Sequence, residues 1–397
     1  MDKKVKLNTL KRFIFPLVQW RYQPWARTRW KMRPAVTLWQ GHTIKTGQPM
    51  TIVYAGEYRS RAAYWVNLML AENRQKHDLG NQWLSALPSL LKNKYPEASL
   101  LIVEKTLFAP LFPFLSRGFL IPYWVQMEID ISKPLDQMSI REKEGFFDIE
   151  RRIRKYNLSC EFTNDPKHME EFFHSMHTPF IRNRHEEESF YMDIEHARKI
   201  FKNAFLCLVK KDGEILGGSV VQTGRRHFLR LIGLKDGNME YIKYGILGAA
   251  YYFAIKRLQE EGHTVLDIGG GNPVLNSGLT RFKSFLKGKV IPYTSLRPRF
   301  LHLIPLRSSP ALSEVFSNLQ ILYHPKYFHP LRAIFVDASE LNNKEAVCKK
   351  LTSKSPQGIR GTEVYILGNY RSEDAAWIKQ EESVVSVQSI NSRLLFP

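Results

Sequence analysis

The sequence predicts an α/β (α+β) fold in which a mixed, mostly antiparallel sheet is flanked by helices. The chain has 397 residues, of which 44% are hydrophobic and 12% aromatic, so it is long enough for two or three domains with buried cores. Helical periods of three to four residues alternate with short apolar runs along most of its length. Two hairpin turns, Asp212-Gly213 and Thr223-Gly224, separate three further strands. We therefore expect antiparallel strands next to helices.

We divide the chain into four parts. They are a basic aromatic arm at 1–40, an N-terminal unit at 41–135, a second unit at 136–295, and a basic-apolar connector with a small C-terminal α/β segment at 296–397. The arm mixes tryptophans with lysines and arginines, a composition that suits a membrane interface or single-stranded RNA. It is equally compatible with an arm that packs its tryptophans on the first domain, and we keep these alternatives open.

The N-terminal unit is expected to contain two helices between strands. The helices are predicted at 59–73 and 83–94, and the strands at 50–55, 99–104 and along the extended apolar run 118–131. No catalytic constellation is recognisable in this part of the sequence.

The second unit is predicted as helix, strand, helices, three antiparallel strands, helix and strand. Asp165-Pro166 is a good helix start, because Asp is a favoured N-cap and Pro a favoured first residue. We expect strands at 158–162, 205–210, 214–222, 227–234 and 265–268, and helices from 165, at 193–204 and from 241 to 258. The segment 177–185 is expected to be a basic loop, and 296–331 an irregular cover, before strands and helices alternate again from 333.

The net charge of +20, from 58 Lys and Arg against 38 Asp and Glu, attracts polyanions but names none of them. Three cysteines, Cys160, Cys207 and Cys348, lie far apart without metal-binding spacing, so we expect core thiols in a reducing compartment. The histidines also lack zinc-site spacing, and we expect no metal. Neither a run of ~20 apolar residues nor a signal-peptide pattern is visible. These features indicate a cytoplasmic protein, with binding at the inner face of the membrane as an open alternative.

The stretch 241–293 carries most of the functional information. A helix ends at Gly262, a short strand reaches Asp267, and Gly269-Gly270-Gly271 follows, where the backbone is able to approach a ligand or a neighbouring segment closely. A nucleotide-binding methyltransferase would place an acidic residue about 20 residues further on. Here no acidic residue occurs between Asp267 and Glu314. That interpretation is therefore disfavoured.

The same stretch resembles the second half of a GNAT-type acyltransferase, and more narrowly the Fem-like branch, which is related to peptidoglycan aminoacyltransferases. The matching residues are Asp267, Gly269, Gly270, Gly278, Leu279, Phe282 and Lys283. The order of elements upstream also fits. The resemblance implies two tandem GNAT-like units, a degenerate one at 41–135 and a catalytic one at 136–295.

The resemblance also implies roles for individual residues. Lys283 and Asp267 would be catalytic: Lys283 would stabilise the oxyanion or pair with a phosphate, and Asp267 would bind the acceptor amine or act as the base. The start of the helix from 241 would face the donor's pyrophosphate, with Lys243, Tyr244, Gly245, Gly248 and Phe282 as donor-binding residues. The acceptor side would comprise Arg154, Arg182, Arg184, Gly269 and Gly270. Each role has a purely structural alternative. Lys283 would be a surface lysine, Asp267 a carboxylate that caps the glycine turn, and Arg154 part of a solvated helix face.

By this resemblance the protein would transfer an acyl or aminoacyl group to an amine of a cell-envelope or small-metabolite acceptor. The donor would be acyl-CoA or aminoacyl-tRNA. The usual coenzyme-A signature is broken, with Ile242, Gly245 and Leu247 at its positions, but no long coiled-coil arm is evident, so we favour acyl-CoA. The alternative is a non-catalytic basic module that binds RNA or an anionic membrane on a GNAT scaffold. We expect no DNA partner.

Overall fold

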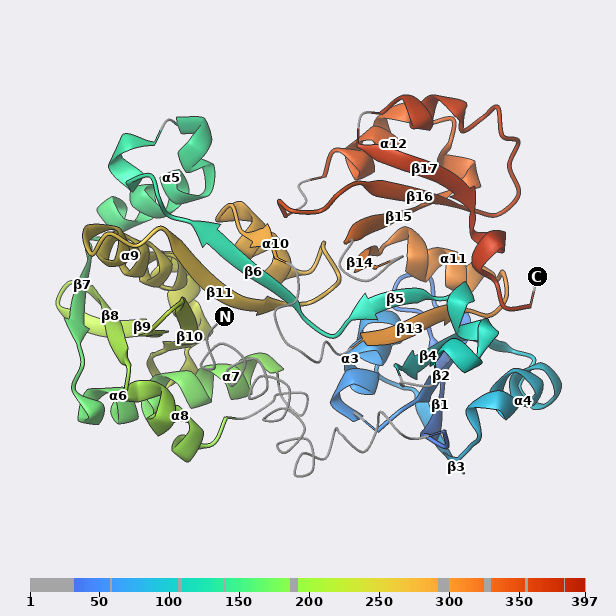
Figure 1. Cartoon of the computed structure of the whole chain (residues 1–397), viewed down its shortest axis with the longest axis horizontal. Helices are drawn as coiled ribbons and strands as arrows, with labels where there is room; N and C mark the ends of the chain where they lie inside the picture. Colours follow the sequence, from blue (N-terminus) through green and yellow to red (C-terminus); the bar gives the residue numbers. More distant parts are fainter. Residues whose placement is uncertain are drawn as a thin grey trace, which may run out of the picture.

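The structure is a computed structural model that describes residues 32–57, 59–105, 109–138, 140–185, 192–291, 300–324, 330–353, 356–381 and 383–396. Within these residues the strands form three sheets. Figure 1 shows one sheet with its helices on the left and the other two sheets stacked on the right. The predicted arm falls largely outside the described residues. Its last part, however, belongs to a strand, β1.

The sheet that carries the candidate site has the strand order β12-β6-β11-β10-β9-β8-β7. Its strands are β6 (Val125–Asp130), β7 (Leu158–Thr163), β8 (Ala204–Lys211), β9 (Glu214–Gln222), β10 (His227–Leu234), β11 (Val265–Gly271) and β12 (Lys289–Val290). β10 and β11 are parallel, and the other neighbours are antiparallel. The predicted meander is thereby confirmed, together with the mixed, mostly antiparallel sheet.

The first sheet has the strand order β3-β1-β2-β4-β13-β5. Its strands are β1 (Ala35–His42), β2 (Pro49–Ala55), β3 (Gln75–Asn81), β4 (Ala98–Glu104), β5 (Phe119–Pro122) and β13 (Phe300–Pro305). β2 and β4 are parallel, as β10 and β11 are in the other sheet. β4 is buried along almost its whole length, as expected for a central strand between two covered faces.

These two sheets repeat one pairing pattern. In β1-β2-β4-β13-β5 and in β9-β10-β11-β6-β12, an antiparallel pair is followed by a parallel pair and then by two antiparallel pairs. The structure therefore has two tandem GNAT-like units, although no repeat is visible in the sequence.

The two units exchange a strand. β6 follows β5 in the chain but pairs with β11, and β13 follows β12 but pairs with β4 and β5. β6 lies inside the predicted first unit and β13 inside the predicted C-terminal part, so a division of the chain at 135/136 and 295/296 separates each of them from the sheet it belongs to. The boundaries themselves stay a prediction.

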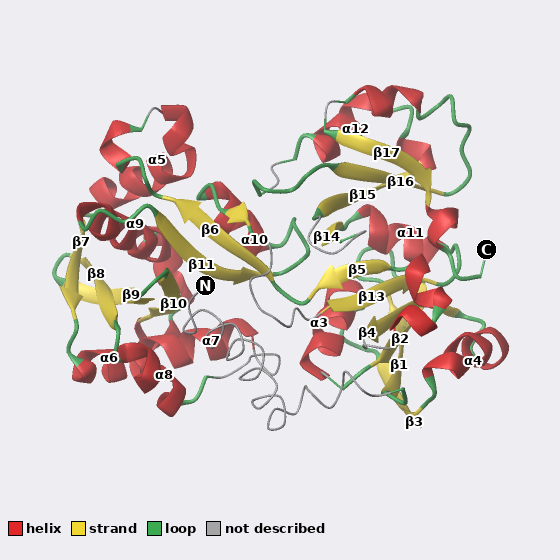
Figure 2. Cartoon of the chain, in the orientation of Figure 1, coloured by secondary structure: helices red, strands yellow, loops and turns green. Residues whose placement is uncertain are grey.

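The helices cover the faces of the sheets (Figure 2). They are α3 (Arg59–Met69), α4 (Leu87–Lys94), α5 (Ile140–Lys155), α6 (Pro166–Phe172), a π-helix (Phe173–His177), α7 (Thr178–His185), α8 (Ile194–Phe201), α9 (Ile246–Glu260), α10 (Gly278–Phe285), α11 (Pro310–Ser317) and α12 (Lys344–Leu351). Among the described residues no helix is both long enough and apolar enough to cross a membrane.

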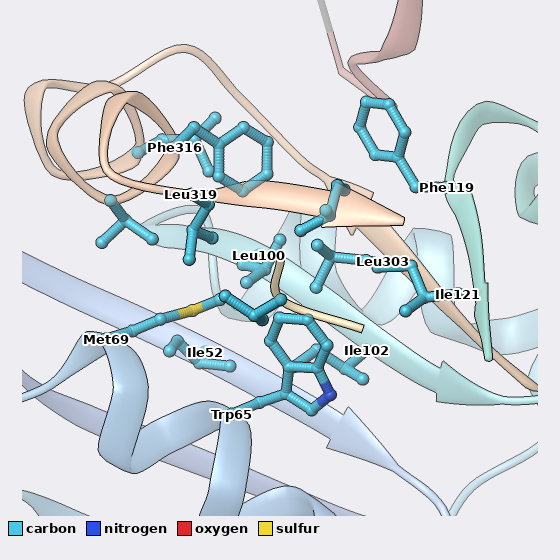
Figure 3. Close-up of a cluster of buried hydrophobic side chains, with 14 of the residues drawn as sticks. Ile52, Trp65, Met69, Leu100, Ile102, Phe119, Ile121, Leu303, Phe316 and Leu319 are labelled. Atoms are coloured by element: carbon cyan, nitrogen blue, oxygen red, sulfur yellow. The ribbon is translucent and has the colours of Figure 1, made fainter. Parts of the chain in front are cut away.

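The C-terminal segment forms a small sheet of its own, β14-β15-β16-β17. Its strands are β14 (Gln320–Tyr323), β15 (Leu331–Asp337), β16 (Thr362–Leu367) and β17 (Val384–Ser389). Its aromatic side chains join the core of the first unit, where Phe119 meets Tyr323 and Tyr365 edge to face at centroid distances of 5.3 and 5.1 Å. Figure 3 shows this shared core around Trp65, Phe119 and Phe316.

The structure corrects three expectations. The helix expected from 241 begins at Ile246, because Gly245 takes a left-handed conformation (φ 84°) that separates α9 from a 3-10 helix at Met239–Tyr244. The expected loop at 177–185 is the end of the π-helix followed by α7. The segment 296–331, expected to be irregular, contains β13, α11 and β14, whose short runs between prolines gave no clear period.

Candidate functional site

The candidate site lies where the two parallel strands of the second unit separate. β10 and β11 pair through His227 with Leu266 and through Phe228 with Asp267. Within the described residues their pairing ends there, although β10 continues to Leu234 and β11 to Gly271. Beyond that point the two strands are not paired, although a Cβ at Gly269 would still lie 3.7 Å from the Leu229 carbonyl oxygen and from Lys283 Nζ.

A bulge in β11 sets the backbone geometry where the pairing to β10 ends. The register with β6 shifts between Asp267, opposite Glu128, and Gly270, opposite Gln126, and Gly269 takes a φ of 76°. A left-handed residue is what such a bulge requires, and glycine adopts it without steric cost. The glycine run thus serves first to bend the end of the strand.

Asp267 holds the bulge together. Its side chain is 3% exposed; Oδ1 accepts from the Gly269 N–H at 2.9 Å, and Oδ2 from Gln126 Nε2 at 2.5 Å. Burial raises the pKa of Asp267 above its ordinary value, although both hydrogen bonds and the charges of Arg226 and Lys283 act in the opposite direction. The arrangement is that of a capping carboxylate, with a basicity greater than that of an exposed aspartate.

Lys283 reaches the same bulge from α10. Its side chain is 4% exposed, and Nζ donates to the carbonyl oxygens of Ile268 at 2.6 Å and Gly270 at 2.7 Å. Lys283 therefore does not point to solvent. It places a buried positive charge against the backbone at the end of β11, where the parallel pairing to β10 has ended.

Two arginines and a tryptophan surround this end of the strands. Arg230 of β10 lies over the ring of Phe228 at 3.9 Å and donates to Gln222 Oε1 at 2.7 Å. Arg226 pairs with Glu128 of β6 at 3.3 Å. Trp124, just before β6, packs against Gly270 and is 43% exposed. The site thus combines positive charge with an exposed aromatic ring.

The first turn of α9 lies against α5. A Cβ at Gly245 would come within 2.8 Å of Arg152 Cδ, and one at Gly248 within 3.0 Å of Ile149 Cγ1. Arg152 donates to the Lys243 carbonyl at 3.0 Å and pairs with Asp148 at 3.0 Å. Both glycines therefore have a packing role, and a cation stands at the helix end whose dipole favours anions.

His177 lies against the part of β10 that has left β11. Its Nδ1 is 2.8 Å from the Ile232 carbonyl oxygen, which can only accept, so Nδ1 carries the proton. Burial lowers the pKa of His177, which favours the neutral ring. The neutral ring with its proton on Nδ1 keeps the Nε2 lone pair for accepting a proton.

The structure brings together Lys283, Asp267, Gly269 and Gly270, and separately Lys243, Tyr244, Gly245 and Gly248 around the start of α9. Phe282 packs α10 on α9, edge to face with Tyr251 at 5.5 Å. Lys243 pairs with Glu240 at 2.8 Å. Arg154 is exposed on α5 and Arg182 on α7, and the Arg184 side chain lies outside the described residues. The roles assigned to all of them stay predictions.

Sequence reasoning missed the contribution of β6. Trp124 and Gln126 were placed in the N-terminal unit, yet β6 lies beside β11 and supplies both a hydrogen bond to Asp267 and the exposed ring. A signal was present, because Gln126, Glu128 and Asp130 alternate with apolar residues. Such alternation marks a strand with one polar face.

Among the described residues no group of three or more His, Cys, Asp and Glu side chains has the geometry to hold a metal ion. Among the described residues, the charged groups near the bulge include two carboxylates, Asp267 and Glu128, besides Lys283, Arg226 and Arg230. These residues are able to bind an anion, polarise a carbonyl and exchange protons.

The order of elements from α5 to α10, with α9 between two parallel strands that separate, defines a GNAT-like fold. No family model and no curated protein matches the chain. Among solved structures it is similar to FemX, at 15% identity over 66% of this chain and 83% of that one, with a TM-score of 0.36. L-PGS from Bacillus licheniformis follows at 12% identity, 68% and 80% coverage and a TM-score of 0.32. A tandem GNAT protein from the clavulanic acid biosynthesis pathway is 11% identical, with 57% of this chain and 74% of that one covered and a TM-score of 0.27.

Proposed function

We propose that the protein is an acyltransferase that moves an acyl or aminoacyl group from acyl-CoA or aminoacyl-tRNA to an amine of a cell-envelope or small-metabolite acceptor. The observation that carries this proposal is the separation of β10 from β11 beside a buried lysine and a buried aspartate. A donor lying between the strands would present its carbonyl to backbone and side-chain groups of both.

The residues would share the steps of the reaction. The amine attacks the donor carbonyl, and negative charge develops on the carbonyl oxygen. As the tetrahedral intermediate collapses, the thiolate or the ribose oxygen leaves and takes up the proton that the amine has lost. Lys283 supplies a fixed positive charge and holds the bulge. His177, through Nε2, would take the proton of the attacking amine, and Asp267 would attract the protonated amine before it reacts.

The donor's phosphates would bind at the first turn of α9. Backbone N–H groups and the helix dipole favour an anion there, and Arg152 and Lys243 lie at the same turn. Arg152 is already held against Gly245 by the Lys243 carbonyl. An anion that displaces water from this arginine would gain a charge-assisted hydrogen bond at little ordering cost.

Donor binding is the first test. The full chain is titrated with acetyl-CoA, a long-chain acyl-CoA and an aminoacyl-tRNA, and bound species are identified by native mass spectrometry. One of these donors should bind, and Arg152→Gln should weaken an acyl-CoA about tenfold, the effect of one charge-assisted bond. Lys256→Gln, an exposed residue of α9, serves as the matched control and should leave the affinity unchanged.

Turnover is the second test. Free thiol or free tRNA is measured in the presence of a set of primary amines, for the wild-type chain and for His177→Asn. We expect turnover for the wild type and at least a tenfold loss of kcat in His177→Asn with donor affinity retained. Binding of tRNA or anionic vesicles without turnover of any donor would instead favour the non-catalytic basic module.

A further inference from the structure

Two cysteine thiols touch within the second unit, on the side of the sheet that packs against the start of α9. Cys160 of β7 and Cys207 of β8 lie with their Sγ atoms 3.0 Å apart. Cys160 is opposite Val209 in the register and Cys207 opposite Phe162, so the two thiols are diagonal neighbours on one face of the antiparallel pair. Diagonal neighbours are close enough for longer side chains to meet.

The two thiols differ in accessibility. Cys207 is fully buried, in the cluster that includes Ile246 and Ala249 of α9. Cys160 lies in β7, the last strand of this sheet, and is partly exposed. A reagent from solvent would therefore reach Cys160 first, with Cys207 directly behind it.

We propose that Cys160 and Cys207 form a modification site at which a low-molecular-weight disulfide, such as oxidised glutathione, converts the two thiols into a disulfide bond. The Cys160 thiolate attacks one sulfur of the small disulfide, and one small thiolate leaves. Cys207 loses its proton to solvent, attacks Cys160 Sγ in the mixed disulfide, and the second small thiolate leaves. Two protein thiols are thus oxidised, and one small disulfide is reduced to two thiols.

The bond requires the two strands to adjust, because diagonal neighbours stand roughly 7–8 Å apart and a disulfide spans a shorter Cα–Cα distance. The sulfurs must approach by about 1 Å to reach the S–S bond length of ~2.05 Å. Burial raises the pKa of the Cys207 thiol, so the second step is slow near neutral pH and faster as the pH rises. The protein is therefore expected to react over minutes to hours, as disulfide exchange in folded proteins does.

The bond would connect the border strand of the sheet to its interior. β7 follows α5 after a short turn, and α5 covers the first turn of α9 through Ile149 and Arg152. A crosslink from β7 to β8 beneath α9 would therefore limit the movement of α5 away from α9. This consequence does not depend on which donor, if any, binds there.

The test uses the full chain with Cys348→Ser, which leaves Cys160 and Cys207 as its cysteines. After incubation with oxidised glutathione at pH 8, the intact mass should fall by two hydrogen atoms, and proteolysis without reductant should yield a peptide pair joined through 160 and 207. Addition of Cys207→Ser should stop the reaction at a glutathione adduct on Cys160, and Cys160→Ser should leave the chain unmodified.

The thermal unfolding midpoint provides a second readout that needs no further variant. The oxidised Cys348→Ser protein should unfold about 5 °C higher than the reduced one, and dithiothreitol should reverse this shift. The proposal is overturned if the Cys348→Ser protein accumulates only the glutathione adduct, or if it stays unreacted under conditions that oxidise its urea-unfolded form. A lower midpoint after oxidation would show that the bond does not fit the native strands.

Discussion

Replacement of Lys283 by methionine tests how the end of β11 is held. Methionine has nearly the volume of the lysine stem but no donor, so the carbonyl oxygens of Ile268 and Gly270 lose bonds of 2.6 and 2.7 Å to an ammonium group. Each hydrogen bond to a charged group contributes about 1.5–3 kcal/mol. Against this stands the desolvation of the ammonium, which the variant avoids. We expect a net loss of about 3 kcal/mol in the free energy of unfolding.

The assay is urea unfolding followed by far-UV circular dichroism, together with hydrogen exchange of peptides that cover β11. Exchange in β11 and β6 should rise more than exchange in the first sheet, because the bulge lies between those two strands. Lys256→Met, on the exposed side of α9, is the matched control and should change stability by less than about 0.5 kcal/mol. If Lys283→Met were as stable as this control, the two ammonium–carbonyl bonds would not support the bulge.

Three other expectations concern stability and the start of α9. Burial lowers the pKa of His302 from 6.5 to about 4, so the free energy of unfolding should fall by about 3 kcal/mol as the pH drops from 6.5 toward 4. His302→Phe should flatten this pH dependence, measured by urea titration at a series of pH values. Gly245→Ala should lower the free energy of unfolding by about 2 kcal/mol, because Gly245 has a left-handed φ and a Cβ there would meet Arg152. Gly213 has a left-handed φ but no neighbour within 4 Å, so Gly213→Ala should lower it by about 1 kcal/mol in the same titration. Glu363→Leu should lower the thermal midpoint, because it removes the partly buried carboxylate that accepts from Tyr365 at 2.6 Å and lies 4.0 Å from Arg393; an unchanged midpoint would contradict this.

Local signals in the sequence predicted much of the second unit. Asp165 caps α6 by accepting from the Lys167 N–H at 2.8 Å, as its position before Pro166 indicated. The turn between β8 and β9 has both Asp212 and Gly213 at positive φ, 50° and 87°, which is the backbone that an Asp-Gly hairpin turn needs. Each of these features depends on a few consecutive residues, and for that reason the sequence predicts it.

Features that depend on distant pairing were beyond the sequence. The positive φ of Gly269 belongs to a bulge that exists only because β6 lies beside β11. The buried position of the Lys283 side chain depends in turn on that bulge. The sequence motif therefore identified Lys283 as a site residue but did not predict its hydrogen bonds to Ile268 and Gly270. α9 was placed too early because Tyr241 and Tyr244 continue its apolar spacing through a 3-10 helix that Gly245 separates from it.

The exchange of β6 and β13 bears on how the chain folds during synthesis. β4 and β5 leave the ribosome well before their common neighbour, because Pro122 ends β5 and Phe300 begins β13. At 5–20 residues per second, translation of the intervening chain takes about 10 to 40 s. Throughout that interval β4 and β5 lack β13, the strand that lies between them in the finished sheet. Their unpaired edges would then be accessible to chaperones or to mispairing with other nascent chains.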